Sequence, residues 1–310
     1  SFFLFLLQSF SSNFVLKITH YMNLLNFFRR FPNEKSCRKH FKNLRIKQGV
    51  TCKQCKSKEH YWIKTKEQFE CKSCKFRTGL RSGTVMEASK LPFLYWYATM
   101  HLITSTKKSF SAKELQRQLG HKRYEPVWAM LHKLRVVMGE RDRKYQLNDF
   151  VELDEGFFSN TDQVDSKKTP VLVAAESFPL KVKKKHKPER IVRYLKMEVL
   201  EDRTQNAIFY EAKKMINSNA TLRTDGLQAY KYISKIIPKH QRIICKDKKE
   251  VSKLFPWVHT AISNFRKILL GIHHGVKSKY FQNYLNEFCY KFNRRSYNLN
   301  IFDRLLIAAV

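Results

Sequence analysis

The sequence is poor in the two residues that mark flexible or low-complexity chains, with only 9 Gly and 8 Pro among 310 residues. Collagen-like and linker-rich proteins are therefore excluded. Acidic residues are also scarce, because 26 Asp and Glu stand against 60 Lys and Arg and leave a formal charge of +34. So basic a protein favours a polyanionic partner, and nucleic acid is the first candidate because lysine and arginine bind phosphate.

Long apolar runs are missing as well. The chain opens with Ser-Phe-Phe-Leu-Phe-Leu-Leu, which is far shorter than the roughly 20 apolar residues that a membrane span needs. No basic residue precedes this run and no small-residue cleavage site follows it, so it makes a poor signal peptide. We expect residues 1–21 to be a disordered segment, or upstream sequence translated ahead of Met22.

Cysteine is limited to seven residues, four of which form two matched pairs. This usage does not fit a secreted disulfide framework and indicates a reducing compartment with one metal site. The pairs are Cys52-x-x-Cys55 and Cys71-x-x-Cys74, separated by enough chain for a small hairpin. Their spacing predicts a structural zinc ribbon, in which four thiolates complete a closed tetrahedral shell. Cys37 and His60 are possible spare ligands.

Helical patterns dominate the region after the cysteines. Residues 91–104 read as an apolar core helix, and Ser111 with Glu114 forms a capping-box pattern before a second helix. Gly120 ends that helix, and a third follows with apolar residues at three-to-four spacing. Helix, turn and helix suggest a DNA-binding helix-turn-helix, although an ordinary helical hairpin would look the same. The outer face predicted to contact phosphate carries Lys122, Arg123, His132, Lys133 and Arg135.

Strand patterns begin at residue 150. We expect three strands, then a helix, a strand, a helix, a strand and two further helices. The strands are predicted at 150–153, 169–176, 191–200, 220–226 and 242–245, and the helices at 204–216, 228–236, 258–270 and 279–294. This order predicts an α/β ribonuclease-H-like fold, a mixed sheet with flanking helices, because three antiparallel strands are followed by two that join through helical crossovers.

Two aspartates stand at the ends of strands that are neighbours in this fold. Asp154 ends the first strand and Asp225 ends the fourth, just before Gly226. Each has an ordinary explanation, as an exposed acidic strand end and as a turn residue. Placed together, their carboxylates can bind one or two Mg²⁺ ions, whose hard oxygen chemistry suits in-line phosphoryl transfer. A third ligand should come from the late helices. Asn264 is our candidate, with Glu250 and Glu287 as carboxylate competitors.

Several separate motifs now occur in an order that resembles one family. They are Glu152-Leu-Asp-Glu-Gly-Phe-Phe, Arg223-Thr-Asp-Gly-Leu-Gln-Ala-Tyr, His259-Thr-Ala-Ile-Ser-Asn, and the Tyr284-Leu-Asn-Glu-Phe run that ends at Arg295. Together they resemble bacterial insertion-sequence transposases of the ISXO type, which place a DDE-type catalytic domain behind a zinc ribbon. The likeness extends over residues 22 to about 305. It implies that Asp154, Asp225 and Asn264 hold catalytic Mg²⁺ or Mn²⁺, with Arg266 or Lys267 as an accompanying basic residue.

The resemblance also implies an activity and its partners. A transposase of this kind binds the inverted repeats at the element's ends, cuts a DNA strand and lets the freed 3′-hydroxyl attack target DNA. Its partner is double-stranded DNA, on which it acts as a homo-oligomer, in the bacterial cytoplasm with the nucleoid. The residues predicted to contact DNA in the catalytic domain are Lys183, Lys184, Lys185, Lys187, Arg266 and Lys267. Two alternatives stay open: a zinc-ribbon DNA-binding regulator without catalysis, and a ribonuclease-H-like nuclease without strand transfer.

The expected domain organisation follows from these patterns. We predict an upstream-translated or disordered segment, a helical lead-in, a zinc ribbon, a helical DNA-binding segment and a ribonuclease-H-like DDE-type catalytic domain. Their boundaries are 1–21, 22–50, 51–80, 81–145 and 146–310.

Overall fold

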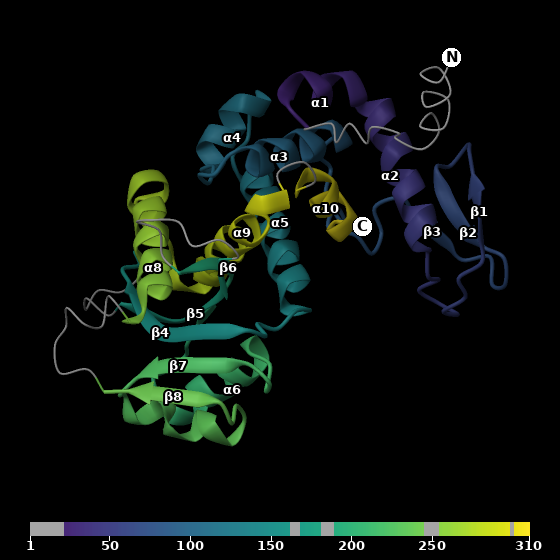
Figure 1. Cartoon of the computed structure of the whole chain (residues 1–310). Helices are drawn as coiled ribbons and strands as arrows, with labels where there is room; N and C mark the ends of the chain where they lie inside the picture. Colours follow the sequence, from purple (N-terminus) through teal and green to yellow (C-terminus); the bar gives the residue numbers. More distant parts are fainter. Residues whose placement is uncertain (1–21, 162–167, 181–188, 245–253, 298–300) are drawn as a thin grey trace, which may run out of the picture.

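The computed structural model describes residues 22–161, 168–180, 189–244, 254–297 and 301–310. Three parts follow one another across the molecule: a small sheet, a helical body and a larger sheet with helices on both faces (Figure 1). Residues 1–21, the competitor Glu250 and the lysine run that was predicted to contact DNA lie outside the described residues. That run comprises Lys183, Lys184, Lys185 and Lys187.

The small sheet is the predicted zinc ribbon. Strands β1 (His60–Ile63), β2 (Gln68–Cys71) and β3 (Arg77–Gly79) pair antiparallel in that order. Helix α2 (Glu34–Gln48) follows α1 (Leu24–Arg30) and packs on the ribbon. Arg45 of α2 donates to the carbonyl oxygens of Leu80 and Ser82, both at 2.8 Å, and is itself buried. The helix and the ribbon therefore form one unit.

The helical body consists of α3 (Phe93–Ser105), α4 (Ala112–Leu119) and α5 (Glu125–Arg143). Ser111 caps α4 by accepting from the Glu114 N–H, and Gly120 ends it with φ of 61°, a left-handed conformation that glycine adopts easily. The predicted helix, turn and helix are therefore present. Their core contains Trp96, Leu115 and Leu134 together with aromatic residues of α1 and α2.

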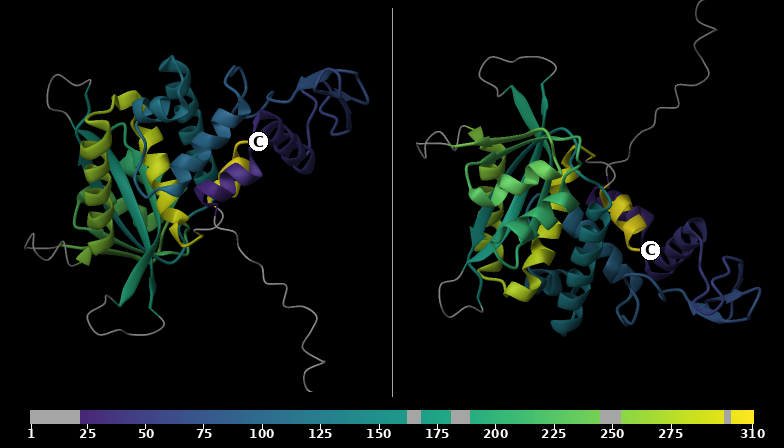
Figure 2. Two further views of the ribbon diagram at one scale, coloured as in Figure 1. Left: turned by 90° about the horizontal axis from the view of Figure 1, so that it is seen from above. Right: turned by 90° about the horizontal axis from the view of Figure 1, so that it is seen from below.

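The C-terminal helix α10 (Ile301–Ala308) returns to the helical body. Phe302 packs edge-on against Phe27 of α1, with ring centroids 6.0 Å apart, and the Val85 N–H donates to Ala309 O at 3.1 Å. Both views in Figure 2 place the C-terminus beside the first helices. Residues 301–310 therefore pack in the first core, whereas the sequence-based boundaries grouped them with the catalytic domain.

The larger sheet has the order β6-β5-β4-β7-β8. Its strands are β4 (Phe150–Phe158), β5 (Thr169–Pro179), β6 (Arg190–Val199), β7 (Thr221–Asp225) and β8 (His240–Ile243). The first three pair antiparallel, while β7 pairs parallel with β4 and β8 pairs parallel with β7. This is the mixed sheet of the predicted ribonuclease-H-like fold.

Helices cover both faces of the larger sheet. On one face α6 (Gln205–Met215) and η1 (Gln228–Lys235) pack against apolar residues of β4 and β7. On the other lie α8 (Pro256–Ile268) and α9 (Phe281–Asn293), linked by a π-helical turn, η2 (Leu269–His273), and a short 3₁₀ turn, η3 (Ser278–Tyr280). Another 3₁₀ turn, η4 (Arg295–Tyr297), follows α9. The segment predicted as a helix at 228–236 is a 3₁₀-helix over 228–235.

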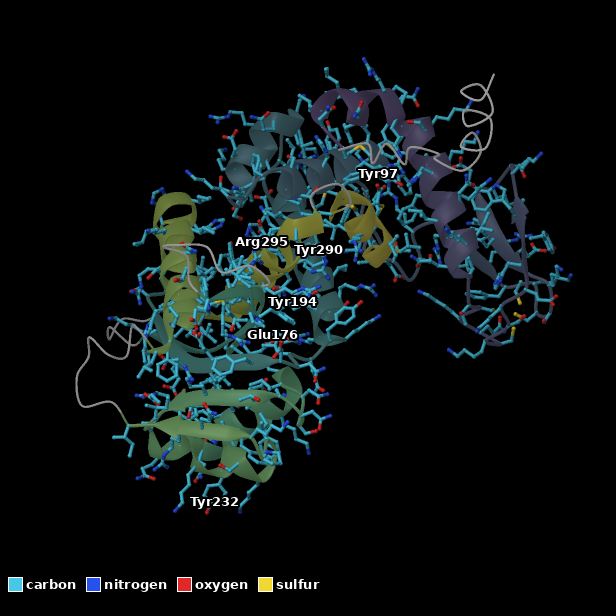
Figure 3. The ribbon with its side chains drawn as sticks, viewed as in Figure 1. Tyr97, Glu176, Tyr194, Tyr232, Tyr290 and Arg295 are labelled. Carbon is cyan, nitrogen blue, oxygen red and sulfur yellow. The ribbon has the colours of Figure 1, made fainter. Side chains whose placement is uncertain are left out.

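Helix α9 joins the two large parts, because its residues enter both cores. Phe281 and Leu285 pack with the sheet, and Tyr290, labelled in Figure 3, packs with the helical body. Between α5 and α9 the Arg135 Nε donates to Glu287 Oε2 at 2.8 Å, with both side chains almost fully buried. The prediction that Arg135 and His132 face DNA is therefore wrong, since both are buried against α9.

Candidate active site and zinc centre

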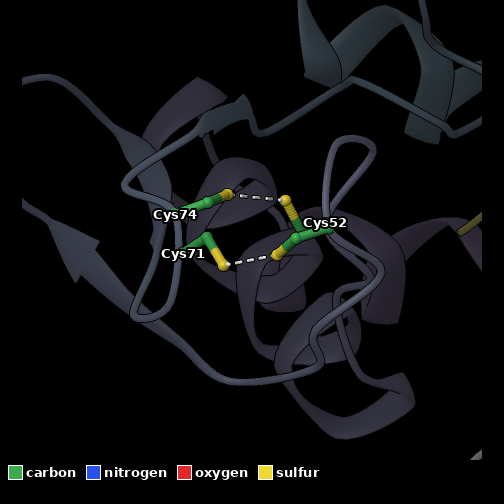
Figure 4. A group of neighbouring side chains, drawn as sticks. Cys52, Cys71 and Cys74 are labelled. Atoms are coloured by element: carbon green, nitrogen blue, oxygen red, sulfur yellow. Dashed lines mark hydrogen bonds between the residues drawn. The ribbon is translucent and has the colours of Figure 1, made fainter.

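The four paired cysteines converge in the ribbon (Figure 4). Their sulfur atoms lie within 4.8 Å of one another, and the Cys52–Cys74 and Cys55–Cys71 Sγ distances are both 3.5 Å. Four sulfurs at 2.3 Å from a tetrahedral zinc ion would stand about 3.8 Å apart. The thiols are therefore already close to the geometry of a structural zinc site.

The two Cys-x-x-Cys segments fold in the same way. The N–H groups of Lys56 and Lys75 each donate to the carbonyl of the first cysteine in their pair at 3.1 Å, and both lysines have φ of 62°. Each turn also directs backbone N–H groups at sulfur, and the Cys74 N–H lowers the pKa of Cys71 to about 6. Thiolates are the form that binds zinc, so this backbone arrangement favours the metal. Cys37 is buried in the helical core instead.

Asp154 and Asp225 lie side by side on neighbouring strands. Strands β4 and β7 are parallel, with Leu153 opposite Thr224, so each aspartate is the next residue along. Leu153 and Leu222 pack in the core beneath α6. Because strand side chains alternate between faces, both aspartates point to the other face, where α8 lies. The two carboxylates repel: burial, then the nearby Asp225, raises the pKa of Asp154 to about 6.

Backbone groups hold one oxygen of each carboxylate. The Glu155 N–H donates to Asp154 Oδ1 at 2.8 Å, and the Leu227 N–H donates to Asp225 Oδ1 at 3.0 Å. His259 of α8 approaches the other oxygen, with its Nε2 3.8 Å from Asp154 Oδ2. That ring nitrogen is buried and has no hydrogen-bond partner among the described residues. Carboxylate oxygens and imidazole nitrogens are ligand types that divalent metal ions accept. In the described part of the chain, however, only the four cysteines already converge closely enough to hold an ion.

Glu152 positions α8 over this site. It is buried, and its Oε2 accepts from the first-turn N–H groups of Trp257 at 2.9 Å and Val258 at 3.2 Å. Burial raises its pKa to about 7, although those two N–H groups oppose the shift. No sequence pattern indicated this cap directly. The one signal in the sequence was that Glu152 is an acidic residue on the same face of the strand as Asp154.

Two stretches of the chain match families of known proteins. Residues 146–293 match the ISXO2-like transposase domain, and residues 32–77 match the transposase zinc-ribbon domain. The chain belongs to the ISXO2-like transposases. No curated protein matches it. The zinc-ribbon match begins in front of α2, consistent with the packing of that helix on the ribbon in this transposase.

The structure places the third predicted ligand differently from the two aspartates. In this transposase the buried side of α8 carries Ala261, Ile262 and Phe265, and His259 flanks it near Asp154. At about 100° per residue, Asn264 lies about 140° around the helix from His259. Asn264 is exposed and makes no described hydrogen bond to either aspartate.

The remaining candidates separate clearly. Arg266 donates to Phe157 O at 3.3 Å, which ties the end of α8 to β4, while Lys267 is exposed. Glu287 lies in the ion pair with Arg135 and is not available to a metal at the aspartates.

None of the helices in the described part of this transposase combines the length and the apolar composition that a membrane span requires.

Proposed function

We propose that this insertion-sequence transposase binds the inverted repeats of its element and performs metal-dependent strand cleavage and strand transfer. The observation that carries the proposal is the position of Asp154, in the middle of β4, next to Asp225, at the end of the parallel neighbouring strand β7. Both reactions are phosphoryl transfers at one site, and each needs oxygen ligands for a hard divalent ion.

Each residue of the proposed site has a role that follows from its surroundings. Bound Mg²⁺ or Mn²⁺ would activate the attacking hydroxyl and stabilise the leaving oxygen. Asp154 and Asp225 would hold the ion, and the backbone N–H groups on their Oδ1 atoms fix the direction of the carboxylates. Glu152 keeps α8 in place across the site. Asp154 must lose its proton to bind metal, and its raised pKa makes that step sensitive to pH near 6.

Two residues of α8, Asn264 and His259, are the candidates for the third metal ligand. Asn264 is the residue that family resemblance implies, and it would require α8 to turn when DNA and metal bind. His259 is the rival, because its ring already lies 3.8 Å from Asp154. The variants Asn264→Ala and His259→Ala separate them. Loss of the true ligand raises the Mg²⁺ concentration needed for half-maximal strand transfer, and loss of the other residue does not.

Double-stranded DNA is the proposed substrate. The excess of positive charge suits a long phosphate contact, and Lys267 stands exposed at the end of α8 with the Arg266 backbone anchor beside it. The zinc ribbon and the α4–α5 hairpin are proposed to recognise the element's ends. We further propose that the protein works as a homo-oligomer on DNA in the bacterial cytoplasm, at the nucleoid.

The experiment uses labelled duplexes made from the DNA that flanks the gene. Asp154→Asn should abolish Mg²⁺-dependent cleavage and joining while duplex binding stays at the wild-type level. Asp149→Asn is the matched control, because that aspartate stands just before β4 and its side chain is 44% exposed. Strand transfer by Asp154→Asn at the wild-type rate would sink the catalytic assignment. Wild-type protein that binds the ends without cutting would favour the non-catalytic regulator, and nicking without joining would favour the nuclease.

A further inference from the structure

A cavity of about 440 Å³ opens where the helical body meets the catalytic domain. Its walls come from the start of α4, the start of α5 and the segment between α8 and α9. Aromatic rings form one side: Trp128, Tyr280 and Tyr284, with Tyr124 at the rim. Trp128 meets Tyr280 edge-on, with ring centroids 4.9 Å apart. This volume lies in the range of small-molecule sites.

Positive and polar groups line the rest of the cavity. Lys113, Lys277 and Lys279 reach it from two separate segments. The residues at the N-terminus of α4, Ser111 and Ala112, also line it, and a helix N-terminus attracts anions. His273 is a further wall residue, and its buried Nε2 has no hydrogen-bond partner in the described part of the chain. Aromatic faces and lysines are the features that bind a base and its phosphate.

We propose that this cavity receives one unstacked nucleobase of the DNA, with its phosphate held by the lysines and the start of α4. The inference rests on the proposed function, because it assumes that the protein works on DNA. A base outside its stack exposes both faces, so Trp128 and Tyr280 offer it the ring contacts that it loses in the duplex.

The base in the cavity is separate from the reacting nucleotide. Strand β4 advances about 3.3 Å per residue, so Phe158 lies about 13 Å beyond Asp154. The cavity lies past that end, where the Thr161 N–H donates to Val276 O at 3.2 Å. At about 3.4 Å per step along a strand, the unstacked base stands about four steps or more from the site of cleavage.

Fluorescence anisotropy with two probes tests the proposal on the full zinc-loaded chain. One probe is a fully paired duplex, and the other is the same duplex with a short run of unpaired thymidines at one 3′ end. The wild-type protein should bind the second probe about 5- to 150-fold more tightly, the range that base–aromatic stacking supplies. Trp128→Ala should lower this preference to about twofold or less.

Two further variants guard against misfolding. Trp128 also packs on His132, with centroids 4.0 Å apart, so its removal can loosen α5. Tyr124 is 39% exposed at the rim, and Tyr124→Ala should reduce the preference without that loss of packing. Tyr210→Ala is the matched control, because this tyrosine is 61% exposed on α6, outside the cavity lining.

Each outcome of these binding measurements supports or contradicts the proposal. A wild-type protein that binds both probes equally overturns the cavity proposal and leaves the proposed function standing. Unchanged preference in both Trp128→Ala and Tyr124→Ala also overturns it. Failure to bind either probe would overturn the proposed function and this inference together.

Discussion

Breaking the buried ion pair between Arg135 and Glu287 should destabilise the whole protein. The pair joins α5 to α9 at 2.8 Å, and the side chains are 1% and 3% exposed. Glu287 also accepts from Ser109 at 2.8 Å and lies 3.7 Å from Lys291. Burial alone would raise the pKa of Glu287, but Arg135 and Lys291 outweigh it, and the pKa is lowered. The carboxylate is therefore held charged by two cations.

The cost of losing that carboxylate can be worked out in two ways. Coulomb's law at 2.8 Å gives about 6 kcal/mol with an effective dielectric of about 20. Breaking a buried pair by removing one partner typically costs about 3–5 kcal/mol, because the other charge stays buried and unpaired. We expect Glu287→Gln to lower the free energy of unfolding by about 3–5 kcal/mol. Adding Arg135→Met should restore much of the loss, since no buried cation is then left in the pair.

Urea unfolding followed by circular dichroism, with zinc present, measures these changes. The control is Asp303→Asn, which breaks an exposed pair with Arg30 at a similar 2.9 Å and should cost no more than about 1 kcal/mol. If Glu287→Gln unfolds within about 1 kcal/mol of wild type, the reasoning from burial is refuted. The same holds if the double variant is less stable than the single one.

Three further predictions concern zinc, pH and packing. Cys71→Ser, or treatment with a chelator, should release zinc and unfold the ribbon. Mass spectrometry would show the loss of the metal, and near-ultraviolet circular dichroism would show the loss of tertiary structure. A folded ribbon without zinc would contradict the assignment of a structural zinc site. Burial, then Arg135, lowers the pKa of both His132 and His273 to about 4. The free energy of unfolding should therefore fall as the pH drops from about 6.5 toward 4, because the histidines of the unfolded chain take up protons that the buried rings exclude. Unfolding curves of His132→Asn should show a shallower fall with pH. An unchanged slope would argue against a role for His132 in this pH dependence. At Gly139 a Cβ would lie 2.3 Å from Asn286 Nδ2. Gly139→Ala should therefore lower the free energy of unfolding, measured by thermal unfolding, by about 1–3 kcal/mol. A neutral result would mean that α9 can shift to make room for the added methyl group.

Features with a local signal could be predicted from the sequence. The matched cysteine pairs predicted the ribbon, because the two cysteines of each Cys-x-x-Cys segment define one turn of the zinc site. The strand order and the side-chain alternation around Leu153 were enough to place Asp154 beside Asp225, because their strands are parallel neighbours. The prediction that the first strand ends at Asp154 is wrong, since β4 continues to Phe158 through its pairing with β5. None of these inferences needed a contact between distant side chains.

Features that depend on distant contacts could not be predicted. Arg135 looked like a surface residue on a basic helix face, because its partner Glu287 comes from a helix much later in the chain. The return of α10 to the first core has no local sign either. For Asn264, helical periodicity shows which residues share a side of α8 but not which flank of the helix meets the aspartates. Only the contact between His259 and Asp154 fixes that flank.

The return of α10 bears on the order in which the protein can fold during its synthesis. The first core needs Phe27 near the start of the chain and Phe302 near its end. The strands and helices of the larger sheet, in contrast, come from one continuous stretch. Contacts of long sequence separation form late, because closing the chain between them costs entropy. The proposed DNA-recognition half, though translated first, therefore completes its core only after the strands and helices of the larger sheet have left the ribosome.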